Sequence, residues 1–265
     1  MSETTPELAF PTSLGTSDAE HIMLFGQDVA QDLMGKVTFG ELAFRLIARR
    51  SPTPGQSRLF EAVLIGLADH GFTPTAIAAR LTYLSAPDAV QGALAAGLLG
   101  GGSRFLGVTE DTGRFLAEAL ADTAETPRTD EEWDELARAA VRARRAAGEF
   151  VPGLGHPVHK QQDPRTPRLI ALAHEEDVYG PHLALFEAVG RAHPEILGRT
   201  LPLNGAGVSG AALADLGLPV PLLRATVLLA RCAGLIGHIA EEMQRPVANE
   251  IYRAVDRNAY YAPLD

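Results

Sequence analysis

The segment from Phe150 to Arg168 gathers chemically capable side chains in a short stretch. It reads FVPGLGHPVHKQQDPRTPR and holds two histidines, one lysine and two arginines between glycines and prolines. Loops of this composition often carry function on a rigid scaffold. A histidine held by tight turns, such as His156, can present a ring nitrogen to a substrate oxygen, and the planar fork of Arg165 suits a carboxylate. A solvated basic loop is the alternative that composition alone leaves open.

His156 and His159 also have the spacing of a pair of metal ligands. A zinc site needs at least a third ligand, and the sequence offers no cysteine pair or His/Asp cluster in support. We therefore expect no metal here. A third histidine, His70, ends an apolar segment in Asp69-His70-Gly71. A histidine in such a place is more often structural than functional.

The stretch Gly205-Ala-Gly-Val-Ser-Gly210 matches the dinucleotide pattern G-x-G-x-x-G. That pattern requires a preceding strand and an acidic residue about 20 positions on. No convincing strand precedes it, and residues 223–231 contain no acid. We reject a dinucleotide site and expect residues 201–210 to form a glycine-rich connection.

The elements that position these residues read as helices. Thr38 and Thr73 are predicted N-caps, the latter with proline next, and Thr129 forms a capping box with Glu132. Apolar residues recur at helical spacing, whereas alternation of period two is nearly absent. The expected fold class is all-α. The predicted helices cover residues 39–47, 59–67, 74–84, 87–99, 130–147, 168–174, 181–192 and 222–243.

The segment 222–243 is apolar and about long enough to cross a bilayer. It carries Arg224, Arg231 and His238 at intervals of seven residues, which places them along one side of a helix. We expect a core helix with a polar stripe. Arg245, just after it, is in a position where arginine commonly complements the helix dipole.

The composition limits the function classes. The 265 residues carry a net charge of −10, which argues against nucleic-acid and anionic-membrane partners. A single cysteine, Cys232, excludes an internal disulfide and favours a cytoplasmic location, and the first 20 residues lack the pattern of a signal peptide. Residues 138–168 hold seven Lys or Arg and two acids, a local charge of +5. This stretch can attract small anions.

Several segments together resemble the citrate synthase family. Pro152-Gly-Leu-Gly-His156-Pro-Val-His-Lys160, followed by Asp163-Pro-Arg165, is similar to its signature G-x-G-H-x-V and D-P-R. Three other segments occur in the family's order along the chain: Asp69-His70-Gly71 before this signature, and Gly234-Leu-Ile-Gly-His238 and Arg245-Pro246 after it. The resemblance covers about residues 22–261. The D-H-G form and Gly102-Ser-Arg-Phe105 are most similar to short citryl-CoA lyases and the lyase module of ATP-citrate lyase.

The resemblance implies an architecture and a reaction. A large helical domain would comprise residues 1–108 and 203–265, with a smaller helical domain of residues 109–202 inserted, in a homodimer or higher homo-oligomer. The reaction would cleave or form the carbon–carbon bond between an acetyl-CoA-type thioester and oxaloacetate. Coenzyme A would be a substrate, with no covalent cofactor and no metal.

The resemblance also assigns roles to residues. His156 and His70 would be catalytic, and both would contact the oxaloacetate part together with Arg165 and Arg245. His156 would polarise the ketone oxygen or hold the citryl hydroxyl. The residues expected along coenzyme A are Val151, Pro152, Gly153, Leu154, Gly155 and Lys160.

Two departures from the family pattern leave alternatives open. Phe105 stands where synthases carry an enol-stabilising histidine, which favours a lyase. Ala206 stands at the position of the catalytic aspartate, and alanine cannot transfer a proton; losing such a group costs roughly 10²–10⁴ in rate. The nearest acid, Asp215, lies about two helical turns away. The alternatives are an impaired member that binds CoA or a dicarboxylate or serves as a partner subunit, and an enzyme that acts on another acyl-CoA or acceptor.

Overall fold

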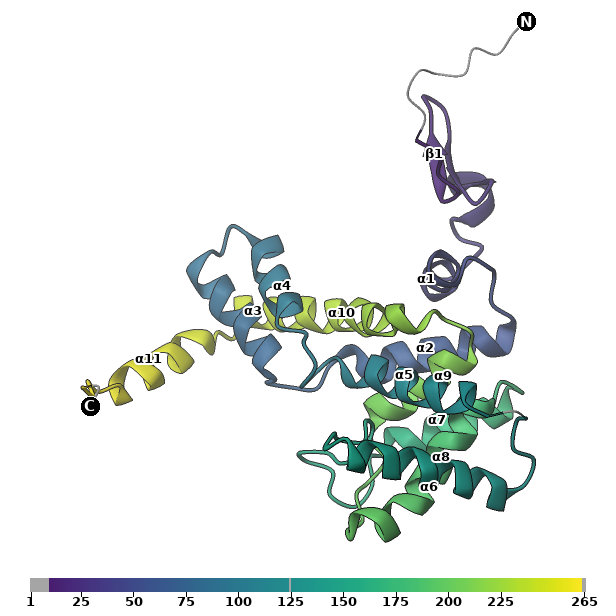
Figure 1. Cartoon of the computed structure of the whole chain (residues 1–265). Helices are drawn as coiled ribbons and strands as arrows, with labels where there is room; N and C mark the ends of the chain where they lie inside the picture. The colour runs from purple at the N-terminus through teal and green to yellow at the C-terminus, as the bar shows by residue number, and fades with distance from the viewer. Residues whose placement is uncertain (1–9, 124, 264–265) are drawn as a thin grey trace, which may run out of the picture. The chain divides into compact units, whose positions relative to one another are not determined.

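The computed structural model describes residues 10–123 and 125–263, which divide into two compact units at Thr53 and Pro54. The first unit contains a small antiparallel sheet of β1 (Gly15–Ser17), β2 (Ile22–Leu24) and β3 (Gln27–Asp28) in the order β1-β2-β3. A π-helical turn, Val29–Leu33, and helix α1 (Phe39–Ala48) follow (purple in Figure 1). The sheet escaped prediction because strands of two or three residues are too short to show alternation.

The second unit is helical, which confirms the predicted fold class of the chain. Its elements are α2 (Pro54–Ala68), α3 (Pro74–Ser85), α4 (Val90–Leu99), α5 (Val108–Ala121), α6 (Asp130–Ala146), α7 (Arg165–Glu175), α8 (Pro181–Leu197), α9 (Gly205–Asp215), the 3₁₀ turn Val220–Leu222, α10 (Leu223–Gln244) and α11 (Ala248–Asn258). Helix α10 packs on α2, α3, α4 and α5, and α6 packs on α8 (Figure 1). The predicted boundaries at 108/109 and 202/203 fall near the starts of α5 and α9, and the division into a large and a small domain remains a prediction.

The predicted helix starts follow the side-chain caps. The side chains of Thr38 and Thr129 each accept from the backbone N–H three residues later. The glutamate at that later position accepts from the backbone N–H of the threonine, which completes a capping box. Thr73 caps α3 with Pro74 at the first helical position. The predicted start of α4 near Pro87 is wrong. Ser85 still belongs to α3, so α4 begins only at Val90, without a side-chain cap.

The glycine-rich connection expected over residues 201–210 is also wrong from Gly205 onward, because these residues begin the buried helix α9. Their glycines are required for close approach. A Cβ on Gly210 would lie 2.2 Å from the carbonyl oxygen of Thr109 in α5, and one on Gly207 would lie 2.6 Å from Cα of Gly153. The side chain of Asn204 caps the helix by accepting from the Gly207 N–H at 2.8 Å.

Two of the three residues in the expected polar stripe of α10, Arg231 and His238, are buried, whereas the side chain of Arg224 is about one-third exposed. Residues 220–244 are long and apolar enough to cross a membrane by length and composition alone. Their buried members include Arg231, His238 and Glu242, which face neighbouring helices. The helix packs on α2, α3, α4, α5 and α9, but only one third of its most apolar stretch is buried, so it is a core helix only in part.

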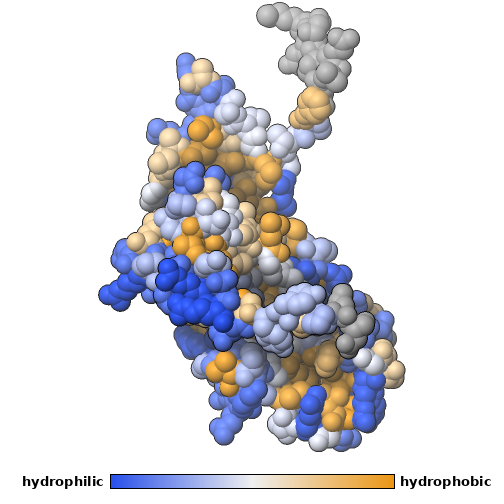
Figure 2. All heavy atoms as spheres, turned by 90° about the vertical axis from the view of Figure 1, so that its left-hand side faces the viewer, coloured by the Kyte–Doolittle hydropathy of each residue, from blue (hydrophilic) through white to orange (hydrophobic). Residues whose placement is uncertain are grey.

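Apolar side chains also reach the surface. Figure 2 shows the side of the molecule that carries α11, where orange patches lie among hydrophilic side chains. Exposed apolar residues of α11 include Tyr252 and Val255. A homodimer remains a prediction.

Candidate active site

A cavity of about 880 Å³ lies in the second unit. Its wall is built from the turn after α2, the start of α5, the loop before α7, the first turn of α9 and the middle of α10. The residues that line it include His70, Phe72, Phe105, Leu106, Val108, Asp111, Glu149, Val151, Pro152, Gly153, Leu154, Gly155, His156, Arg165, Asn204, Ala206 and Arg231.

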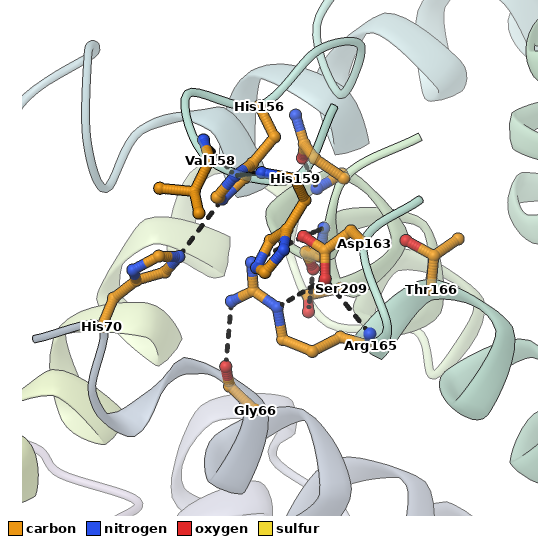
Figure 3. A network of polar contacts seen from close by, with 12 residues as sticks. Gly66, His70, His156, Val158, His159, Asp163, Arg165, Thr166 and Ser209 are labelled. Atoms are coloured by element: carbon orange, nitrogen blue, oxygen red, sulfur yellow. Dashed lines mark hydrogen bonds and ion pairs between the residues drawn. The ribbon is translucent and has the colours of Figure 1, made fainter. Parts of the chain in front are cut away.

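His70 and His156 meet in this cavity, although they are far apart in the sequence. Their Nε2 atoms lie 3.2 Å apart, and their rings stack with centroids 5.1 Å apart (Figure 3). His70 sits in a turn in which Gly71 has a φ of +69°, and the Asp69 carboxylate accepts from the Gly71 N–H at 2.8 Å. His70 lines the cavity, and its catalytic and substrate-binding roles stay predictions.

Hydrogen bonds from the backbone fix the tautomer of His156. Its Nδ1 accepts from the N–H groups of Val158 at 3.1 Å and His159 at 3.0 Å. The proton of the neutral ring must therefore lie on Nε2, which faces His70. Burial lowers the pKa of His156, and this effect outweighs the opposing attraction of Asp163. His156 is thus a neutral N–H donor aimed at the cavity.

His70, His156 and His159 bring their ligand atoms within 4.8 Å of one another. The structure supplies the third histidine that the sequence pattern lacked. A metal-bound histidine, however, normally donates its other ring N–H to an acceptor. Nδ1 of His156 instead accepts two N–H groups, so it has no proton to donate. The donor set does not fit a metal ion.

Arg165 is held in place by the buried carboxylate of Asp163. Its Nε and Nη2 donate to the two carboxylate oxygens at 3.0 and 2.7 Å, and its Nη1 donates to the Gly66 carbonyl at 3.1 Å. Asp163 also accepts from the Gly205 N–H at 2.7 Å. Burial raises the pKa of Asp163, but the hydrogen bonds from Arg165 and Gly205 lower it further, so the net shift is strongly downward. Arg165 is also the first residue of α7, which was predicted to start at Arg168.

Arg231 is a candidate binding residue that the sequence analysis treated only as part of a helix stripe. It is 4% exposed, and its Nε and Nη1 have no hydrogen-bond partner among the described residues. Burial, with the nearby charge of Arg165, lowers its pKa against the attraction of Asp69. Unpaired buried donors are costly, so an anion in the cavity would relieve this cost. In the sequence, the feature that indicates a binding role for Arg231 is its position as a charged residue within an apolar helix.

The remaining predicted residues are not all brought together. The backbone from Val151 to Gly155 lines the cavity, as expected for a CoA contact. Lys160 lies outside the lining and donates to the His156 carbonyl at 3.2 Å. Arg245 is exposed at the end of α10 and does not line the cavity of this chain. Their assigned roles remain predictions.

The two departures can also be located. Phe105 and Ala206 both line the cavity. Asp215 is engaged elsewhere: its carboxylate accepts from the N–H groups of Gly180 and Leu183 at the start of α8, at 3.0 and 2.9 Å. It is no substitute for an acid at position 206.

Comparison with known proteins identifies the family. The citrate synthase C-terminal domain family matches residues 11–255. The chain belongs to the citrate synthase family. Citryl-CoA lyase from Hydrogenobacter thermophilus is similar over 97% of this chain and 95% of its own, with 27% identity and a TM-score of 0.84.

Two other solved structures share the fold. ATP citrate lyase of Methanosaeta concilii, a D541A mutant in complex with (3S)-citryl-CoA, is 23% identical with a TM-score of 0.75 over 100% of this chain and 43% of its own. Citrate synthase of Thermoplasma acidophilum, with carboxymethyl coenzyme A and oxaloacetate, is 18% identical with a TM-score of 0.65 over 86% and 58%. A comparison with curated proteins gave no match. The family and these neighbours are enzymes.

Proposed function

We propose that this family member is a citryl-CoA lyase-type enzyme, which cleaves or forms the bond between an acetyl-CoA-type thioester and oxaloacetate. The observation that carries the proposal is the convergence of one imidazole N–H and two guanidinium groups on one cavity. His156 supplies the N–H, and Arg165 and Arg231 supply the guanidinium groups. Similarity to a citryl-CoA lyase along nearly the whole of both chains supports it.

The groups match the charge of the substrate. The oxaloacetate part carries two carboxylates, and guanidinium forks bind carboxylates with two parallel hydrogen bonds. Arg231 has free donors for this purpose. Arg165, held rigid because its Nε and Nη2 donate to Asp163 and its Nη1 to Gly66, keeps a second N–H on each of Nη1 and Nη2 for a ligand. The Nε2–H of His156 would donate to the oxygen that is a hydroxyl in the thioester and a ketone in oxaloacetate.

The rest of the cavity suits a thioester. Phe72, Phe105, Leu106 and Val108 provide an apolar wall. The segment 151–155 offers backbone along this wall, and Gly153 and Gly155 have φ values of +83° and +82° that a side chain would disfavour. The volume of about 880 Å³ is within the range typical of small-molecule sites.

The test is release of oxaloacetate from citryl-CoA by the purified chain. We expect turnover by the wild type and its loss in His156→Ala. Arg231→Met removes the unpaired donors while keeping an unbranched side chain, so it should raise KM by about tenfold or more, since a charged hydrogen bond contributes about 1.5–3 kcal/mol. A wild-type chain that releases no oxaloacetate would refute the proposal.

A binding protein without turnover is a second candidate, favoured by Ala206 in the cavity wall. It predicts calorimetric binding of CoA or oxaloacetate by a chain that cleaves nothing. Ala206→Asp distinguishes the two candidates. If this variant gains cleavage that the wild type lacks, the alanine marks a lost catalytic group. An active wild type rules the binding protein out.

A further inference from the structure

Cleavage of the proposed substrate needs a group that takes a proton from the hydroxyl and one that gives a proton to carbon. Ala206 provides neither. Two carboxylates line the cavity among the described residues, and both face arginines: Glu149 pairs with Arg144, and Asp111 lies 3.8 Å from Arg224. His70 and His156 are the remaining candidates for the proton-transferring group.

The hydrogen bond between the two histidines identifies the base. Because His156 carries its proton on Nε2, it is the donor of the 3.2 Å contact, and Nε2 of His70 is the acceptor. Neutral His70 therefore carries its proton on Nδ1 and offers a lone pair on Nε2. A basic nitrogen thus lies beside the N–H that would hold the substrate oxygen (Figure 3).

Hydrogen bonds between the half-exposed Asp69 and the buried side of α10 hold the turn that carries His70. Asp69 accepts from Nε2 of His238 at 2.9 Å as well as from the Gly71 N–H. Nδ1 of His238 in turn accepts from Nε of Arg80 at 3.0 Å. This chain of donors leaves His238 neutral with its proton directed at Asp69. These hydrogen bonds hold the turn in place, so His70 needs little movement to accept a proton.

We propose that His70 is both the general base and the general acid of the cleavage, an assignment that rests on the proposed function. Nε2 of His70 takes the hydroxyl proton as the substrate displaces the contact between the histidines. The carbon–carbon bond breaks, its electron pair passes into the thioester enolate, and the former hydroxyl oxygen becomes the ketone held by His156. The imidazolium then returns the same proton to the enolate carbon, which yields the acetyl thioester and neutral His70.

The cleavage needs no reactant other than the thioester and His70. One proton moves from oxygen to nitrogen and then to carbon, and no electrons enter or leave. The hydroxyl oxygen and the accepting carbon are two bonds apart in the substrate, so one nitrogen can reach both. Ala206 fits such a mechanism, because no second proton carrier is required.

The test compares His70→Gln with His174→Gln. His174 stacks on Tyr179, with ring centroids 3.9 Å apart, and does not line the cavity. At saturating citryl-CoA we expect kcat of His70→Gln to fall roughly 10²–10⁴-fold, and that of His174→Gln to remain near the wild-type value. Glutamine still accepts from His156, so oxaloacetate affinity measured by calorimetry should fall less than kcat.

Chemical rescue separates a missing base from a damaged site. Added imidazole should restore part of the kcat of His70→Gly, and substituted imidazoles should restore more as their basicity rises. The assignment is overturned if His70→Gln keeps its kcat and loses only affinity, or if Asp111→Asn shows the loss expected of His70→Gln. A wild type without turnover overturns the proposed function as well, whereas turnover that survives in His70→Gln overturns the assignment alone.

Discussion

Replacing Arg80 with methionine tests the buried polar network behind the cavity. Arg80 is fully buried, and its Nη1 donates to Glu242 at 2.8 Å while its Nε donates to His238. Its Nη2 pairs with Glu241. Because Glu241 is half exposed, its contribution is small, whereas the side chain of Glu242 is only 3% exposed.

The magnitude follows from the charge left behind. Methionine fills most of the arginine volume, so the main loss is not a cavity. Glu242 becomes a buried carboxylate without its cation, which costs about 3–5 kcal/mol. Glu242→Gln in the same chain removes that charge and keeps Oε1, which accepts from the N–H groups of Val247 and Ala248 at 2.9 and 2.8 Å. The double variant should therefore recover at least about 1.5 kcal/mol.

The assay is urea unfolding of the full chain followed by far-UV circular dichroism. Arg168→Met is the matched control: Arg168 pairs with Glu175 at 2.8 Å, both are exposed, and its loss should cost less than about 1 kcal/mol. A loss in Arg80→Met no larger than in this control would contradict a stabilising role of the buried pair, as would a failure of Glu242→Gln to recover stability in the Arg80→Met background.

Three further predictions concern residues in the cavity wall or in contact with it. Gly207→Ala places a Cβ 2.6 Å from Cα of Gly153 and should lower the free energy of unfolding by about 1–3 kcal/mol, whereas Gly102→Ala, with open space around it, should change little in the same urea titration. Asp163→Asn removes the charged anchor of Arg165 and leaves this partly buried cation with a weaker partner; calorimetry should show oxaloacetate binding weakened by at least about tenfold. Because the folded-state pKa of His156 lies below 6.5, the neutral ring contributes stability that is present above that pH and decreases as the pH falls; in unfolding experiments His156→Gln should show a smaller loss between neutral and acidic pH.

The parts of the fold that the sequence predicts well are those encoded by neighbouring residues. Thr38 and Thr129 are N-caps, and the glutamate that completes each capping box lies three positions later. The starts of α1 and α6 can therefore be found from the sequence alone. The glycines of α9 behave differently. Glycine is needed at these positions because the helix lies against α5 and Gly153, which are distant in sequence. The local sequence, rich in glycine, resembles that of a loop.

The candidate site divides in the same way. The loop with His156 and Arg165 stands out by composition and by resemblance to the citrate synthase family. Arg231 does not, because its importance lies in the absence of a partner, which only the packed structure reveals. The tautomer of His156 likewise depends on two backbone N–H groups that a folded loop turns toward its ring.

The loop before α7 and the start of α9 are joined by backbone hydrogen bonds. The Gly155 N–H donates to the Pro202 carbonyl at 2.8 Å, and the Asn204 N–H donates to the Gly153 carbonyl at 2.9 Å. These two segments must therefore move as one piece. His70 and Arg231 lie on other elements, and the contacts that cross to α2 and its following turn include the bond from Arg165 to Gly66 and the one between the histidines. Because α2 also packs on α7 and α9, a shift of this joined piece would change the distance between the two histidines together with the anchoring of Arg165.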